Sequence, residues 1–89
     1  MVTAVVLIEA ETAKINRLAE QLVEIDAVSE VFSVAGRYDL VALVRVQRNE
    51  DLADVIGDRV RQLDGIVKTE TLISFRVYSR AETEGVFSI

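Results

Sequence analysis

The stretch "VAGRYDLVALV", residues 34–44, decides the fold of this chain. Gly36-Arg37-Tyr38-Asp39 separates two segments that are typical of strands, residues 28–35 and Leu40–Val46. Glycine readily takes a positive φ, and aspartate bonds nearby backbone, so the stretch predicts a tight β-hairpin. In that hairpin Arg37 and Tyr38 point to water. The open question is whether "GRYD" is only a turn, or a turn that also holds a ligand.

On either side of the hairpin, segments with the apolar pattern of a strand alternate with segments that have the apolar pattern of a helix. The run "VTAVVLI" (Val2–Ile8) is β-branched and continuous, which predicts a strand buried on both faces. Apolar residues at helical spacing predict two helices, and period-2 alternation predicts a last long strand. These three elements are a helix that Thr12 caps and Asp26 and Ala27 end, a helix that Asn49 caps and Asp64-Gly65 stops, and a strand over Ile66–Tyr78.

The order β-α-β-β-α-β carries an internal echo. "EIDAV" (Glu24–Val28) matches "QLDGI" (Gln62–Ile66) at an offset of 38 residues. Two similar β-α-β halves predict an α+β, ferredoxin-like βαββαβ sandwich: a four-stranded antiparallel sheet with two helices on one face. We expect residues 1–79 to form this domain and residues 80–89 to be a C-terminal tail.

Two helices cover only one face of such a sheet, yet the strands carry aliphatic side chains on both. The uncovered face therefore needs another protein surface, most simply a second copy across a two-fold axis. We expect a homodimer, and dimers that assemble further, because both sides of the strands carry such side chains, among them Val5, Leu7, Phe32, Leu43 and Phe75.

Composition excludes several classes of function. The chain has no cysteine and no histidine, which removes thiolate chemistry and the commonest general base and metal ligand. The net charge is −5 and the basic residues are scattered, which argues against direct nucleic-acid binding. The apolar start of the chain is too short for a signal peptide or a membrane span. We expect a cytoplasmic protein with no catalytic residues, no metal site and no cofactor.

Two segments resemble a known family. "VFSVAGRYDLVALV" (Val31–Val44), with its Gly-x-x-Asp turn, and "LDGIVKTETLISF" (Leu63–Phe75) are similar to the effector-binding (RAM) domain of the Lrp/AsnC transcription regulators. The resemblance implies that an amino acid binds between neighbouring dimers. By position, the implied ligand-binding residues are Gly36, Arg37, Tyr38 and Asp39 in the turn, and Thr69, Thr71, Ile73 and Ser74 in the last strand.

The chain departs from the family pattern at its start. Family members usually carry an N-terminal helix-turn-helix domain, whereas the first predicted strand begins directly after Met1. We therefore expect a stand-alone version of the effector domain, or a piece cut to it, which lacks its own DNA-reading element. Its expected partners are the effector, other copies of itself, and a full-length Lrp/AsnC regulator.

Chemistry supports the ligand hypothesis without deciding it. An amino acid needs an acceptor for its ammonium group, which Asp39 supplies, and donors for its carboxylate, which backbone N–H groups around Gly36 and the Arg37 side chain supply. The alternatives are a plain turn and threonines that only pack across strands. At the level of function, the alternatives to a sensor are a structural scaffold and a cofactor-free enzyme of the dimeric α+β barrel type. The enzyme is disfavoured because such barrels usually need a buried histidine or tryptophan.

Overall fold

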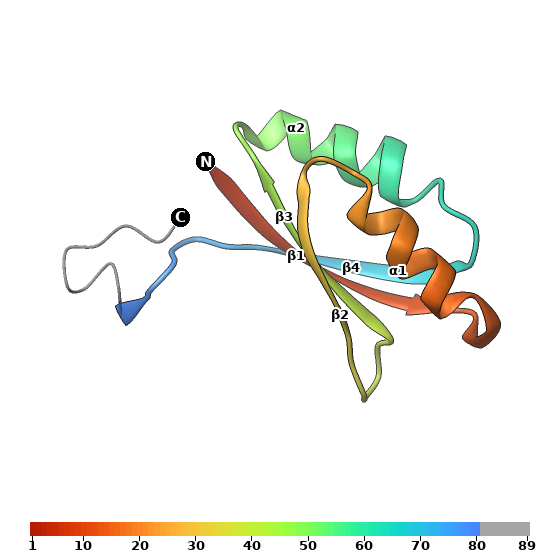
Figure 1. Cartoon of the computed structure of the whole chain (residues 1–89). Helices are drawn as coiled ribbons and strands as arrows, with labels where there is room; N and C mark the ends of the chain where they lie inside the picture. Colours follow the sequence, from red (N-terminus) through yellow and green to blue (C-terminus); the bar gives the residue numbers. More distant parts are fainter. Residues whose placement is uncertain (81–89) are drawn as a thin grey trace.

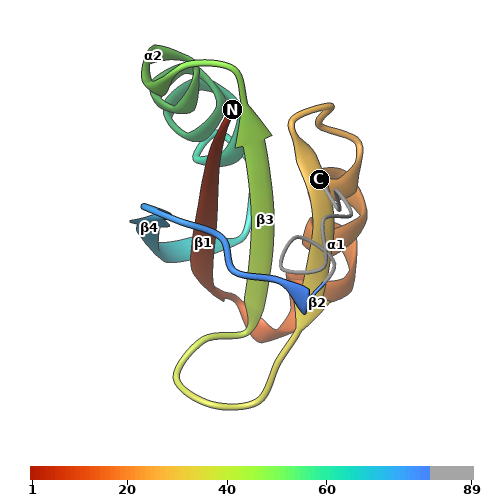
Figure 2. The same ribbon diagram turned by 90° about the vertical axis from the view of Figure 1, so that its left-hand side faces the viewer.

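The computed structural model describes residues 1–80 as a four-stranded antiparallel sheet of order β2-β3-β1-β4, with two helical segments on one side (Figures 1 and 2). The predicted order β-α-β-β-α-β is confirmed. The elements are β1 (Val2–Ala10), a 3-10 turn η1 (Thr12–Lys14), α1 (Ile15–Val23), β2 (Val28–Ser33), β3 (Leu40–Val46), α2 (Asn49–Ala53), its π-helical continuation η2 (Asp54–Val60), and β4 (Ile66–Ile73).

The core lies between the helices and the two central strands. Alternate residues of β1 and β3 point to the helices and are buried, including Val6, Ile8 and Val44, each at 0% exposure. Leu18 and Leu22 of α1 are four residues apart, and both are buried against this layer. The apolar side of the strands thus packs against the apolar side of α1, and the buried residues of this core are all apolar.

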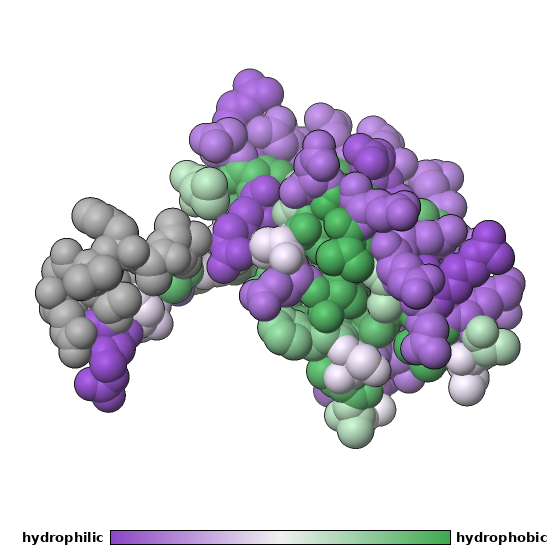
Figure 3. All heavy atoms as spheres, viewed as in Figure 1, coloured by the Kyte–Doolittle hydropathy of each residue, from purple (hydrophilic) through white to green (hydrophobic). Residues whose placement is uncertain are grey.

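Within residues 1–80 no helix covers the opposite side of the sheet, which we call the open face. It consists of the side chains that point away from the helices, as the strand register places them: Val5, Leu7, Phe32, Val41, Leu43 and Leu72. Phe32 is 45% exposed and Leu72 is 49% exposed. The prediction that β1 is buried on both faces is therefore wrong for the single chain, because only its helix-facing side is fully buried. Figure 3 has the view of Figure 1, in which the helices are seen and the open face is turned aside; apolar side chains gather at its centre, between the hydrophilic surfaces of the helices.

Several predicted helix boundaries differ from the observed ones. Thr12 is not an N-cap, because it lies inside the 3-10 turn and the turn has no side-chain cap. Asn49 is the first residue of α2 rather than its cap. The cap is Arg48, whose N–H donates to the Asp51 carboxylate at 3.2 Å.

Two strands end earlier than predicted. β2 ends at Ser33, and β4 ends at Ile73 rather than Tyr78. The pairing of Glu9 with Lys68 and of Ala10 with Ile66 leaves Val67 as an extra residue, a β-bulge. Val67 therefore leaves the alternation in which the sequence had placed it.

No helix within residues 1–80 is long and apolar enough to cross a membrane. The tail predicted at residues 80–89 lies outside the described residues except for Arg80.

The α1 stripe predicts the cost of losing one core contact. Leu18→Ala should lower the free energy of unfolding by about 2–5 kcal/mol, because it removes a fully buried side chain and leaves a cavity. Val23→Ala on the same helix is the control, since Val23 is 52% exposed and should change stability by less than about 0.5 kcal/mol. Urea unfolding followed by circular dichroism measures both. Equal effects of the two substitutions would contradict this assignment of the core.

Candidate functional site

Residues 34–39 form an open loop between β2 and β3, wider than the predicted tight hairpin. The Val34 N–H donates to the Asp39 carbonyl at 3.0 Å and closes the loop at its base. Gly36 has φ +136°, as predicted, and a Cβ built there would meet nothing within 4 Å. Glycine is therefore needed here for backbone conformation and not for space. Residues 34–37, at the tip, are exposed.

Asp39 fastens the loop to the end of β1. Its Oδ2 accepts a hydrogen bond from the Ala10 N–H at 2.8 Å, and its own N–H donates to the Ile8 carbonyl at 2.9 Å. The prediction of a bond to nearby backbone was wrong, because Ala10 is 29 residues away in sequence. Within the described chain only Oδ2 of this carboxylate is hydrogen-bonded, so Oδ1 keeps its capacity to accept.

The Tyr38 side chain points toward β4. The prediction that it points to water is therefore wrong. Its hydroxyl donates to Glu70 Oε1 at 2.5 Å. Glu70 pairs with Leu7 in the register, so the bond lies on the side of the open face. The hydrogen bond to Glu70 raises the pKa of Tyr38 above its ordinary value of 10.0, with smaller contributions in the same direction from burial and from the Glu70 charge.

The sequence did not single out Glu70 or Glu9 as site residues. The charge of Glu9 also raises the pKa of Tyr38, while the charge of Arg37 lowers it. The sequence contains one indication for Glu70. It lies between Thr69 and Thr71 in the last strand, so its side chain is expected on the opposite face from theirs. Arg37 itself is exposed, as predicted.

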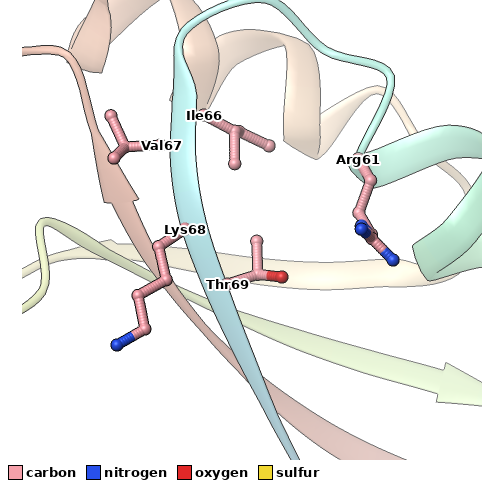
Figure 4. Close-up of a pocket in the computed structure, with 5 residues that line it drawn as sticks. All are labelled: Arg61, Ile66, Val67, Lys68 and Thr69. Atoms are coloured by element: carbon pink, nitrogen blue, oxygen red, sulfur yellow. The ribbon is translucent and has the colours of Figure 1, made fainter.

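The predicted β4 residues lie elsewhere. Thr69, Thr71 and Ile73 face the helical side, as their register partners Ile8, Val6 and Ala4 show. Thr69 lines a pocket of about 490 Å³ with Arg61 and Ile66, and Figure 4 shows these three side chains on one side of β4, with Val67 and Lys68 on the other. A neighbouring pocket of about 430 Å³ under α2 and η2 is lined by Asn49, Leu52, Ala53, Ile56, Gly57, Arg61, Thr71 and Ile73.

Ser74 ends the β4 ladder. Its N–H donates to the Thr3 carbonyl at 2.8 Å, and its hydroxyl donates to the Arg76 carbonyl at 3.1 Å. The structure therefore brings Gly36–Asp39 together at one end of the sheet and does not bring the β4 residues to them. Within one chain the Tyr38–Glu70 bond lies on the side of the open face, whereas Thr69, Thr71 and Ile73 face the helical side.

Within residues 1–80 no group of three or more acidic side chains is arranged to hold a metal ion. The polar groups at the loop are a carboxylate, a guanidinium, a phenol and backbone N–H donors. Such a set holds a small charged molecule by hydrogen bonds and ion pairs, and it contains no activated nucleophile.

Comparison with known proteins gives a consistent result. Residues 3–83 match the family model for the Lrp/AsnC ligand binding domain. The chain is 38% identical over 60 residues to the uncharacterized HTH-type transcriptional regulator PH1916 of Pyrococcus horikoshii, an alignment that covers 67% of this chain and 40% of that protein. The chain thus spans less than half of that relative's length.

Two solved structures share the fold. TTHA0845 from Thermus thermophilus superposes with a TM-score of 0.85 at 46% identity, covering 90% of this chain and 100% of that one. E. coli AsnC superposes with a TM-score of 0.80 at 25% identity, covering 85% of this chain and 52% of that one.

Because Asp39 holds the loop to the end of β1, its substitution is predicted to lower the stability of the protein, and we call this holding contact the fastener role. Asp39→Ala leaves the Ala10 N–H without its partner and should lower the free energy of unfolding by about 1–3 kcal/mol. Asp39→Asn retains an acceptor oxygen and should cost less, and Arg37→Ala on the exposed tip is the control. Urea unfolding, together with hydrogen exchange at the Ala10 amide, measures the effect. An unchanged Ala10 exchange rate in Asp39→Ala would refute the fastener role.

The Tyr38–Glu70 bond predicts a shifted titration. In a Tyr78→Phe background Tyr38 is the only tyrosine, and its phenolate absorbance should rise with a midpoint above 10.0. The bond favours the protonated phenol, so its contribution to stability is full below that ordinary value and is lost as the pH rises through the folded-state pKa. Glu70→Gln should move the midpoint down toward 10.0, whereas Glu30→Gln on β2 should not. Identical midpoints in all three proteins would show that Glu70 does not hold the phenol.

Proposed function

Because the chain belongs to the Lrp/AsnC family, as its two motifs predict, we propose that it binds an amino acid as an effector and couples that binding to assembly in transcription regulation. In this proposal residues 1–79 act as one effector-binding and oligomerisation unit in the cytoplasm. The unit does no catalysis.

The observation that carries the proposal is the state of the 34–39 loop. Within residues 1–80 the backbone N–H groups of Gly36, Arg37 and Tyr38 donate no hydrogen bond, although the base of the loop is firmly held on both sides. Consecutive free N–H groups beside a positive-φ glycine form a concavity suited to an anion such as a carboxylate. Arg37 adds positive charge, and Asp39 Oδ1 is an acceptor for an ammonium group. The loop thus offers complementary groups to both ends of a zwitterion.

The β4 residues enter the proposal through a second subunit. Thr69, Thr71, Ile73 and Ser74 cannot join the loop within one chain, since they lie on the other face or at the far end of the strand. A site that uses both groups must therefore form between subunits. We propose that the open face pairs two copies and that neighbouring dimers bring one loop to another protomer's β4, where the effector binds.

A structural scaffold is the second candidate, and one observation favours it. Tyr38 and Asp39 both already have partners inside the chain, so a rigid loop could serve as a subunit contact without any ligand. In either case, we propose that the effect on transcription runs through mixed assembly with a full-length regulator of the family.

The test is a survey of the twenty amino acids by thermal unfolding and light scattering. An effector at about 100 times its Kd stabilises a protein by about 2.7 kcal/mol, which is a rise of several degrees in Tm for a domain of this size. Arg37→Ala should weaken the response about ten-fold without changing the ligand-free Tm, because the side chain is exposed. Arg59→Ala, an exposed arginine on η2, is the matched control. If no amino acid alters Tm or mass in the unsubstituted protein, the amino-acid proposal fails and the scaffold remains.

A further inference from the structure

Two consecutive backbone amides at the end of β1, those of Ala10 and Glu11, hold two different loops, and we call them the amide pair. The Ala10 N–H donates to Asp39 Oδ2 at 2.8 Å, on the side of the 34–39 loop. The Glu11 N–H donates to the Gly65 carbonyl at 2.8 Å, on the side of the turn that joins η2 to β4. β1 lies between β3 and β4, and consecutive N–H groups of an extended chain point to opposite neighbours. The amide pair therefore connects the 34–39 loop to the start of β4.

The turn before β4 fits closely against the residues beside the amide pair. Gly65 is buried and has φ +102°, a conformation that glycine takes readily. A Cβ built there would lie 3.0 Å from the Lys14 Cβ, so the aliphatic stem of Lys14 packs directly on the turn. The Lys14 ammonium donates to Asp64 Oδ2 at 2.9 Å and lies 3.5 Å from Glu11 Oε2. Backbone and side chains thus hold the turn to the end of β1.

The strand that follows this turn forms the wall of a pocket. Residues 66–69 and Arg61 line the pocket of about 490 Å³ that Figure 4 shows. The register between β1 and β4 shifts at this place, where Val67 is the extra residue of the bulge and is 59% exposed. A bulged residue is left out of the ladder. The start of β4 therefore depends on the neighbouring turn for its position, and with it the wall that carries Thr69.

In the proposed assembly each protomer takes part in two effector sites. It gives its 34–39 loop to one site and its β4 to another, because the two groups do not meet within one chain. We propose that the amide pair couples these two sites, so that an effector bound at a protomer's loop prepares the β4 of the same protomer for a second effector. This inference rests on the proposed function and adds positive cooperativity to it.

The coupling acts through ordering of the chain. An effector that accepts hydrogen bonds from the loop N–H groups restrains the loop, and with it the Asp39 carboxylate. Asp39 then holds the Ala10 N–H more persistently, which also restrains the next peptide group and its bond to Gly65. A ligand that orders a segment lowers the entropic cost for a second ligand that needs the same segment ordered. The second effector therefore binds more tightly than the first.

Hydrogen exchange measures the coupling in the ligand-free protein. Asp39→Ala should raise the exchange rate of the Glu11 amide at least about five-fold, although the bond that it removes is to Ala10. The amide of Val6, which is paired on both sides in the middle of β1, corrects for global opening. Arg37→Ala at the exposed loop tip is the control and should leave the Glu11 rate unchanged. A corrected Glu11 rate that is the same with and without Asp39→Ala overturns the coupling.

Glu11→Pro removes one amide of the pair at a position whose backbone suits proline. Glu11 has φ −63°, the angle that proline fixes, and the preceding residue is in a strand, as proline prefers. The unsubstituted protein is titrated calorimetrically with the one of the twenty amino acids that raises its Tm most. Binding should be cooperative, with later sites at least about five-fold tighter than the first, and Glu11→Pro should make it non-cooperative. Glu11→Ala keeps the N–H and should keep the cooperativity.

A second variant guards against a Glu11→Pro protein that does not fold. Lys14→Met keeps the stem that packs on Gly65, removes the ion pair with Asp64 and should weaken the cooperativity while the circular dichroism spectrum stays native. If none of the twenty amino acids binds, the proposed function fails and the cooperativity fails with it. If an amino acid binds without cooperativity, or if Glu11→Pro and Glu11→Ala change the cooperativity equally, only the coupling is overturned.

Discussion

A sheet with a helical layer on one side only is the constraint on which this structure depends. β1 and β3 carry apolar residues on both sides, and the helices bury only one side, at Val6, Ile8 and Val44. The other side, the open face, retains valines, leucines and a phenylalanine in partial contact with water. Burial of apolar area is the main favourable term in the folding of a small domain, and an 89-residue chain has little of it to leave unused. Assembly and folding are therefore expected to draw on the same surface.

The same constraint shapes the candidate site. The 34–39 loop stands at one end of the sheet, fixed by Asp39 to β1 and by Tyr38 to Glu70 on β4. Within residues 1–80 the N–H groups of Gly36, Arg37 and Tyr38 donate no hydrogen bond, and because these bonds fix the base of the loop, the proposed effector would need to order it little further. They also mean that an Asp39 substitution changes stability and binding together. Arg37, at the exposed tip, is the position where the two effects separate.

Periodicity and the 38-residue echo predicted the element order, and the structure confirms it. The family resemblance of the two quoted motifs is likewise confirmed. Local pattern could not reveal that Asp39 bonds Ala10 or that Tyr38 bonds Glu70, because those partners are 29 and 32 residues away and meet only in the folded sheet. The bulge at Val67 and the early end of β4 also escaped prediction, since an alternating run looks the same whether or not a neighbouring strand is present to pair with it. Whether the β4 residues bind an effector stays a prediction.

The most direct test of this account is the solution mass of the protein and of Leu43→Asp, measured by sedimentation equilibrium. Leu43 lies on the open face opposite Val5, so a charge there should oppose pairing of two copies and leave the helix-facing core intact. The account predicts at least twice 9.9 kDa for the unsubstituted chain, and 9.9 kDa with a native circular dichroism spectrum for Leu43→Asp. A monomeric unsubstituted chain, or a Leu43→Asp protein of unchanged mass, would contradict the claim that a second copy covers the open face.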